Sequence, residues 1–107
     1  MTFAAMFHHF FDEAHARGQG AINADEFNKI IDFLDREFNL LDAEEFTSRV
    51  VAGTAGAADT CLTFDDALKC QIDVAIPVLR ERNLQAFFFI YSSAFTDAPD
   101  DLEFYRD

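Results

Sequence analysis

This sequence of 107 residues has no tryptophan, two cysteines, two prolines and no histidine after His15. The spacing of Cys61 and Cys70 fits neither a metal knuckle nor a dense disulfide framework, so we interpret both as buried free thiols. Free thiols are compatible with a reducing compartment. No apolar run approaches transmembrane length, so we expect no membrane-spanning helix.

Basic residues are scarce as well, because eight Lys and Arg stand against 20 Asp and Glu, a formal net charge of −12. Both halves of the chain are acidic. We therefore expect neither nucleic acid nor an anionic membrane surface as a partner, because both attract basic patches. The N-terminus lacks the basic segment of a secretory signal, and its apolar run breaks at His8 and His9. If Met1 is the native start, we expect a cytoplasmic protein.

Hydrophobic residues, in contrast, make up half of the chain and include 14 phenylalanines, enough for the core of one small domain. We expect residues 2–11 to form a first strand and a loop to follow it. Asn23, with Glu26 in the capping-box position, predicts a helix start. The apolar face of this helix consists of Phe27, Ile30, Ile31, Leu34 and Phe38, which recur at helical spacing. A second helix is predicted to begin at the cap Asp42 and to end at Gly53, with a brief strand at residues 40–41 between the two.

Residues 61–93 have the outline of a strand, a loop, a helix and a second strand. The first strand ends at Asp65 and Asp66. Since proline is tolerated in the first helical turn, Pro77 predicts a helix from Asp73 to Arg82 and leaves residues 65–72 as a loop. The continuous apolar run in residues 84–91 predicts a strand buried on both faces, as parallel sheets require. The acidic tail, residues 94–107, could open another helix at Asp100.

Asp65 and Asp66 lie just past the end of a buried strand, where enzymes with α/β folds carry their catalytic and ligand-binding residues. One carboxylate could bind a cation while the other remains a general base. The simpler alternative is that one of them caps a turn and the other is solvated. His8, His9 and His15 could likewise be proposed as metal ligands. The plain alternative is that His8 and His9 alternate between core and loop at a strand end and that His15 is solvated.

The central motifs resemble the opening of the polysaccharide deacetylase (NodB-homology) domain, carbohydrate esterase family four. The family typically reads T-F-D-D-G, then A-x-P-x-L, then A-T-F-F-V. The matching segments here are Leu62-Thr63-Phe64-Asp65-Asp66, Ala75-Ile76-Pro77-Val78-Leu79 and Gln85-Ala86-Phe87-Phe88-Phe89. Upstream, Met6-Phe7-His8-His9 resembles the M-x-Y-H start of many members.

The resemblance implies the N-terminal portion of a distorted (β/α) barrel, an α/β fold with a mainly parallel sheet. It also implies a metal-dependent carbohydrate N-deacetylase that acts on an N-acetylated amino sugar or polysaccharide, with zinc or another divalent metal as its cofactor. Asp65 corresponds to the general base and Asp66 to a metal ligand. His8 or His9 could line the substrate-binding mouth of the site.

This sequence departs from the family pattern in two places. Ala67 replaces the glycine after the aspartates, so we expect no backbone angle there that only glycine adopts. The H-[ST]-x-x-H motif that supplies two histidine ligands is also absent. We therefore expect residues 1–107 to be a partial deacetylase-like domain, inactive and without stoichiometric zinc unless a C-terminal half completes it. We divide it into three parts. Residues 1–59 hold a first strand and two helices, residues 60–93 hold the strand-loop-helix-strand unit with the Asp-Asp motif, and residues 94–107 form the acidic tail.

Two other functions remain open. The chain could be a truncated or degenerate domain that acts in binding or assembly, because residues 86–91 of a half-barrel would expose a strand edge rich in phenylalanine. Such an edge favours self-association or pairing with a completing segment. Alternatively, the substrate could be a small nucleotide-linked or lipid-linked sugar inside the cell.

Overall fold

The computed structural model describes residues 2–18, 20–66 and 68–89. The strands are β1 (Ala5–Phe7), β2 (Asn39–Leu40), β3 (Asp59–Thr60), β4 (Leu62–Phe64) and β5 (Phe87–Phe88). The helices are α1 (Ala24–Glu37), α2 (Ala43–Ala52), the π-helical turn η1 (Gln71–Ala75) and α3 (Ile76–Glu81). The described strands form two parallel sheets, one in the order β1-β4-β5 and the other made of β2 and β3.

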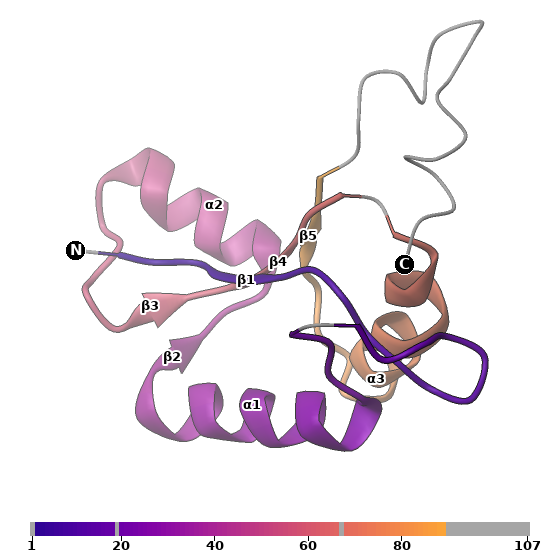
Figure 1. The fold of residues 1–107 in the computed structure, drawn as a ribbon. Coiled ribbons are helices and arrows are strands. Elements are labelled where there is room, and N and C mark those ends of the chain that lie inside the picture. The colour runs from indigo at the N-terminus through magenta and orange to yellow at the C-terminus, as the bar shows by residue number, and fades with distance from the viewer. Residues whose placement is uncertain (1, 19, 67, 90–107) are drawn as a thin grey trace, which may run out of the picture.

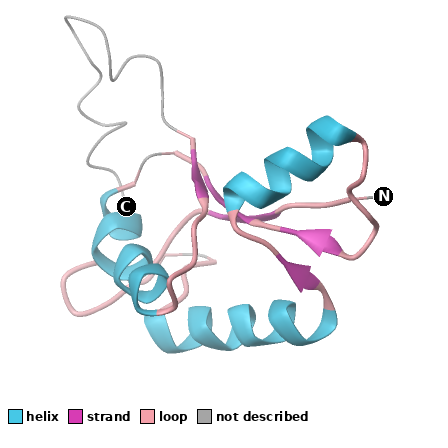
Figure 2. Cartoon of the chain, turned by 180° about the vertical axis from the view of Figure 1, so that it is seen from behind, coloured by secondary structure: helices cyan, strands magenta, loops and turns pink. Residues whose placement is uncertain are grey.

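The strands run between α1 on one side and α2 on the other (Figure 1), and the view from behind shows the same layers (Figure 2). The fold is therefore mixed α/β with a mainly parallel sheet, which confirms that part of the prediction. The closed barrel stays a prediction. The expected brief strand before the second helix is also confirmed, as β2.

Helix α1 begins as its sequence predicts. The Asn23 side chain accepts a hydrogen bond from the Glu26 N–H at 2.8 Å, and the Glu26 carboxylate accepts one from the Asn23 N–H at 3.1 Å. This reciprocal capping box satisfies two amides that the first helical turn leaves without a partner. Phe27, Ile31 and Leu34 are the buried residues of this helix, so its predicted apolar face packs inward.

Replacing the capping residue by Asn23→Ala should lower the free energy of unfolding by about 1 kcal/mol, a typical loss for an N-cap. Urea denaturation followed by circular dichroism measures the change. Asp25→Ala, in the same turn but exposed and outside the capping box, is the matched control, and its effect should be smaller. Equal losses in the two variants would contradict a specific role for the box.

A cluster of phenylalanine rings fills the space between α1 and the three-stranded sheet. The ring of Phe27 lies 5.1 Å from those of Phe7 and Phe10 and 5.9 Å from that of Phe64, each in an edge-to-face arrangement. On the other side, Phe64 stacks on Phe88 of β5 at 4.5 Å. Both geometries are ones that aromatic pairs prefer. The cluster holds β4, and with it the two aspartates, at the centre of the fold.

The start of α2 differs from the prediction. Asp42 is the N-terminal cap residue by position, but its side chain makes no capping hydrogen bond. Its Oδ1 accepts instead from the backbone N–H of Gln85 at 2.7 Å, and Gln85 Oε1 accepts from the Glu44 N–H at 2.8 Å. A residue far along the chain therefore caps α2. The predicted end is confirmed, because Gly53 has φ 72° and its N–H bonds the last turn.

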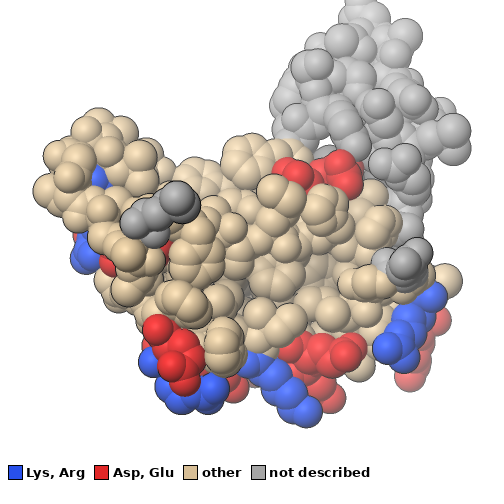
Figure 3. Space-filling model, turned by 60° about the vertical axis from the view of Figure 1, so that its left-hand side comes forward, with Lys and Arg blue, Asp and Glu red and all other residues tan. Residues whose placement is uncertain are grey.

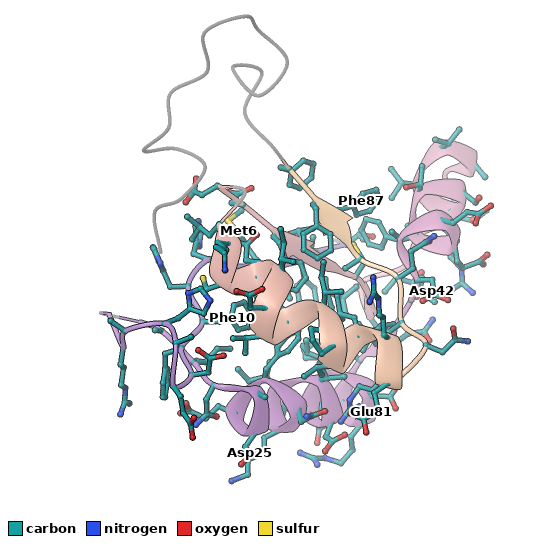
Figure 4. The ribbon with its side chains drawn as sticks, turned by 90° about the vertical axis from the view of Figure 1, so that its right-hand side faces the viewer. Met6, Phe10, Asp25, Asp42, Glu81 and Phe87 are labelled. Carbon is teal, nitrogen blue, oxygen red and sulfur yellow. The ribbon has the colours of Figure 1, made fainter. Side chains whose placement is uncertain are left out.

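The predicted helix start at Asp73 is wrong, because Lys69 and Cys70 are already helical and η1 follows them directly. The Ile76 N–H reaches the carbonyl of Gln71, one residue further back than in an α-helix. Pro77 lies in the first turn of α3, as expected, but the wider π turn before it lets the helix continue upstream. In Figure 4, η1 and α3 form one continuous helical stretch above α1.

Burial of the last described strand on both faces is also wrong. Phe88 is 38% exposed and Phe89 is 53% exposed, and among the described residues β5 pairs only with β4. The long first strand is shorter than predicted, since β1 covers three residues of 2–11. Residues 90 and 91, the tail 94–107 with its expected helix at Asp100, and Ala67 lie outside the described residues.

The sequence did not predict β3. The carboxylate of Asp59, which is 6% exposed, accepts from the Gly56 N–H at 2.9 Å, from Asn39 Nδ2 at 2.7 Å and from Arg49 Nη1 at 3.2 Å. The Gly56 amide contributes most, followed by Asn39, to a pKa of Asp59 below its ordinary value. These bonds join β3 to β2 and to α2, and none of them is visible as a local sequence pattern.

Candidate active site at the carboxyl ends of the parallel strands

The two aspartates lie beside His8 where β1 and β4 end. Phe7 and Phe64 are register partners, so the residues that follow them leave the sheet at neighbouring points. His8 Nε2 is 3.7 Å from Asp65 Oδ2 and 3.8 Å from Asp66 Oδ2. These distances suit ion pairs, although they are too long for direct hydrogen bonds. The three side chains are 44%, 31% and 30% exposed, which leaves them open to a substrate.

The backbone of Asp66 explains why both carboxylates approach one histidine. Successive side chains of a strand point to opposite faces, so a straight continuation of β4 would separate Asp65 from Asp66. Asp66 instead has φ 72°, in the left-handed region that residues other than glycine seldom occupy. The sequence did not predict this angle, because the expectation concerned position 67, which lies outside the described residues. Such conformations cluster at functional sites, where the surrounding structure maintains them.

Gln71 is the residue of this region that the sequence reasoning missed. Its side chain is 1% exposed, and its Nε2 donates to the backbone carbonyl of His8 at 2.9 Å and to that of Asp65. No local signal marks it, because Gln71 stands in a mixed stretch with Lys69 and Asp73 two residues to either side.

His9 is the second histidine after β1. Together with His8 it lines a hollow of about 380 Å³ that also includes Met6 and Gly20. The backbone carbonyl of His9 accepts a hydrogen bond from the Ile22 N–H at 3.2 Å. His8 is therefore the histidine that approaches the aspartates, and both histidines border the neighbouring hollow.

The interpretation of His15 as a solvated side chain is wrong. His15 is 4% exposed, and its Nε2 lies 2.7 Å from Asp73 Oδ2, an atom that Lys69 Nζ also reaches at 2.7 Å. Asp12 Oδ1 accepts from the His15 N–H at 2.8 Å and thereby shapes the loop after β1. The contact joins this loop to η1 across 58 positions of sequence, which local patterns do not reveal.

Lys69, and after it His15, lowers the pKa of Asp73 from its ordinary value of 3.8. A carboxyl whose pKa is lower in the folded chain stabilises the fold above its unfolded pKa, and this contribution disappears as the pH falls through the folded value. Asp73→Asn should therefore lower the free energy of unfolding at neutral pH, and the difference from wild type should shrink below about pH 4. Urea denaturation at a series of pH values measures it. A difference that does not change with pH would contradict the linkage.

Both cysteines are free thiols and buried, as the sequence predicts. Burial raises the pKa of the Cys61 thiol, which keeps it protonated and unreactive at neutral pH. Cys70 Sγ accepts a hydrogen bond from the Phe10 N–H at 3.3 Å, so it has a structural contact in the core.

The donor set for a metal is incomplete in the part of the chain that the structure describes. No group of three or more His, Cys, Asp or Glu residues there is arranged to hold a metal ion. Asp65, Asp66 and His8 thus provide proton acceptors and one or two potential ligands, but not a closed site. Catalytic zinc sites ordinarily use three protein ligands.

The surface around these elements shows no concentration of positive charge on the face drawn in Figure 3, where Lys and Arg lie beside Asp and Glu along the lower rim. Ion pairs join such residues on the described surface, for example Arg82 with Asp32 at 2.7 Å and Arg49 with Glu45 at 2.9 Å. Within residues 2–18, 20–66 and 68–89, none of the helices has the length and apolar character needed to cross a membrane.

No known protein family and no curated protein matches this sequence. Among solved structures, a de-N-acetylase from Aggregatibacter actinomycetemcomitans is similar to this chain with a TM-score of 0.66 and 21% sequence identity. The similarity covers 86% of this chain and 38% of that one, so the chain spans well under half the length of this neighbour. At this level of identity the likeness concerns the fold alone, so this chain shares the α/β fold of the matching part of that neighbour.

Proposed function

We propose that residues 1–107 form the front part of a carbohydrate N-deacetylase of the polysaccharide deacetylase (NodB-homology, carbohydrate esterase family four) type. The observation that carries the proposal is the pairing of Asp65 and Asp66, 3.7 and 3.8 Å from His8, at the carboxyl end of the central parallel strand. The de-N-acetylase-like fold supports it, as do the T-F-D-D and A-x-P-x-L motifs, because the motifs fall on β4 and at the junction of η1 and α3.

In this proposal Asp65 is the general base and takes the proton of the water that attacks the amide carbonyl of an N-acetyl group. A carboxylate within hydrogen-bond reach of that water suits the role. Asp66 is one ligand of a divalent metal, zinc in the family, which would supply Lewis-acid polarisation of the carbonyl. His8, which is exposed at the same edge, lines the mouth of the site and contacts the sugar.

The described residues do not complete the metal site, so the remaining ligands must come from a further segment with the H-[ST]-x-x-H motif. We call residues 1–107 joined to such a segment the completed enzyme. The reading frame after Asp107 in the gene is a first test, and an in-frame continuation with that motif supports the proposal. The decisive test is acetate release from an N-acetylated glycan by the completed enzyme.

A second candidate is a non-catalytic domain that acts in binding or assembly. Strand β5 favours it, since among the described residues it pairs only with β4 and Phe88 and Phe89 are 38% and 53% exposed. A strand edge without a partner readily accepts another chain. A stop codon after Asp107, together with dimers or larger assemblies in sedimentation experiments, would support this candidate. A monomer that gains acetate release once completed would exclude it.

A further inference from the structure

The Gln71 side chain joins the ends of two neighbouring strands. Its amide group donates one hydrogen bond to the carbonyl of His8, after β1, and a second to the carbonyl of Asp65, after β4. Gln71 is 1% exposed, and it begins η1, so the two strand ends are tied to the first turn of a packed helix. The residue lies in the core behind the exposed site.

The chemistry of the two partners requires a primary amide. Backbone carbonyl oxygens only accept hydrogen bonds, and a side-chain amide offers two N–H donors on one nitrogen. The Nε2 orientation follows from this, because the opposite orientation would place Oε1 against two acceptors. Loss of the amide would remove both donors from two carbonyls that are bonded in a partly buried region, and a carbonyl left without a partner in such a region costs stability.

These two bonds act where the pairing of the strands ends. The backbone ladder between β1 and β4 reaches Asp65, whose N–H donates to the Phe7 carbonyl at 3.1 Å. Gln71 then holds the next pair of carbonyls, and these belong to His8 and Asp65, the residues whose side chains face each other at 3.7 Å. The backbone positions that set this separation are therefore attached to one side chain.

We propose that Gln71 is a positioning residue of the site, which fixes the distance and angle between His8 and Asp65 through their backbone carbonyls. The proposal rests on the proposed function where it concerns catalysis. Its geometric part is independent of activity. A displacement of about 1 Å at a reacting group can lower the rate by about 100-fold, so a buried residue that never contacts substrate can control turnover.

Gln71→Met keeps the length of the side chain and removes both donors. Thr63→Val is the matched control, because Thr63 Oγ1 also joins β4 to β1, through a 3.1 Å bond to the Ala5 carbonyl, but within the strands rather than at their ends. In the completed enzyme, Gln71→Met should lower kcat by about 100-fold and leave KM unchanged. Thr63→Val should leave both constants near wild type, although both variants lose stability.

Nuclear magnetic resonance on residues 1–107 tests the geometry without an assay. In the wild-type chain, scalar couplings across hydrogen bonds should connect Gln71 Nε2 with the carbonyl carbons of His8 and Asp65. Gln71→Met should shift the resonances of His8, Asp65 and Asp66, and Thr63→Val should shift those around Ala5 instead. If Gln71→Met does not fold, Gln71→Asn, which retains the amide on a shorter chain, takes its place.

The absence of both couplings in the wild-type chain would overturn the proposal, and so would unchanged strand-end resonances in the folded Gln71 variant. Equal losses of kcat in Gln71→Met and Thr63→Val would reduce Gln71 to a general stabilising role. A completed wild-type enzyme without acetate release would contradict the proposed function, and in that case the couplings still decide whether Gln71 holds the two strand ends.

Discussion

Asp65→Asn in the completed enzyme is expected to lower kcat/KM for acetate release by roughly 10²–10⁴-fold, the usual contribution of a general base. The asparagine has the same size as the aspartate but cannot accept a proton from water at neutral pH. The backbone carbonyl that Gln71 holds is unchanged in this variant, so the strand end should keep its position. The melting temperature should accordingly remain close to that of wild type.

Asp32→Asn is the control for this experiment, since Asp32 is another aspartate with a cationic partner, 62% exposed and situated on α1. It should leave acetate release unchanged. An Asp65→Asn enzyme that retains wild-type activity would remove Asp65 from the mechanism. The proton acceptor would then have to be sought elsewhere, and His8 is the next titratable side chain at the site.

Phe27→Ala is expected to produce the largest loss of stability, about 3–5 kcal/mol, because it removes a fully buried ring and leaves a cavity. Phe27 is 0% exposed and meets the rings of Phe7, Phe10 and Phe64. A domain of this size is typically stable by about 5–15 kcal/mol, so the variant should unfold at a much lower urea concentration. Chemical denaturation followed by circular dichroism gives the difference.

Phe33→Ala provides a matched control on the same helix, with the same change of side chain. Phe33 is 47% exposed, and changes at such surface positions usually alter stability by less than about 0.5 kcal/mol. Similar losses in the two variants would show that the Phe27 cluster is not the core of the fold. The helix propensity change is identical in both variants, so it cancels in the comparison.

The features that sequence reasoning predicted well are those that depend on neighbouring residues. The capping box of Asn23 and Glu26 spans one helical turn, and the left-handed end of α2 at Gly53 needs only a residue without a side chain. The position of Asp65 and Asp66 at the end of β4 is similar, because an apolar run that stops at two charges marks its own boundary.

The features that it missed depend on contacts between distant segments. Asp42 has the sequence pattern of a cap, but its carboxylate accepts a hydrogen bond from the backbone N–H of Gln85 instead. His15 belongs to a polar loop, yet its side chain is buried and contacts the carboxylate of Asp73. Pro77 correctly predicted the first turn of α3. The helix nevertheless begins further upstream than a proline in the first turn would suggest, because the π turn η1 precedes α3 directly.

In the site, too, the features that depend on neighbouring residues were predicted and those that depend on distant contacts were missed. Its two carboxylates were predicted from a motif and from their place after a strand, whereas their approach to His8 follows from the parallel register of β1 and β4 and from the left-handed backbone of Asp66. Gln71 was missed because its partners are backbone atoms, which leave no trace in a sequence. The roles of Asp65 as base and Asp66 as metal ligand stay predictions.

The most direct test measures zinc content and acetate release on the same preparations of residues 1–107 and of the completed enzyme. An N-acetylated glycan is the substrate, and the Asp65→Asn form of the completed enzyme is included. We predict neither stoichiometric zinc nor acetate from residues 1–107, and one zinc with acetate release, dependent on Asp65, from the completed enzyme. Stoichiometric zinc with acetate release by residues 1–107 alone, or no acetate from the completed enzyme, would contradict the account of these residues as half of a deacetylase site.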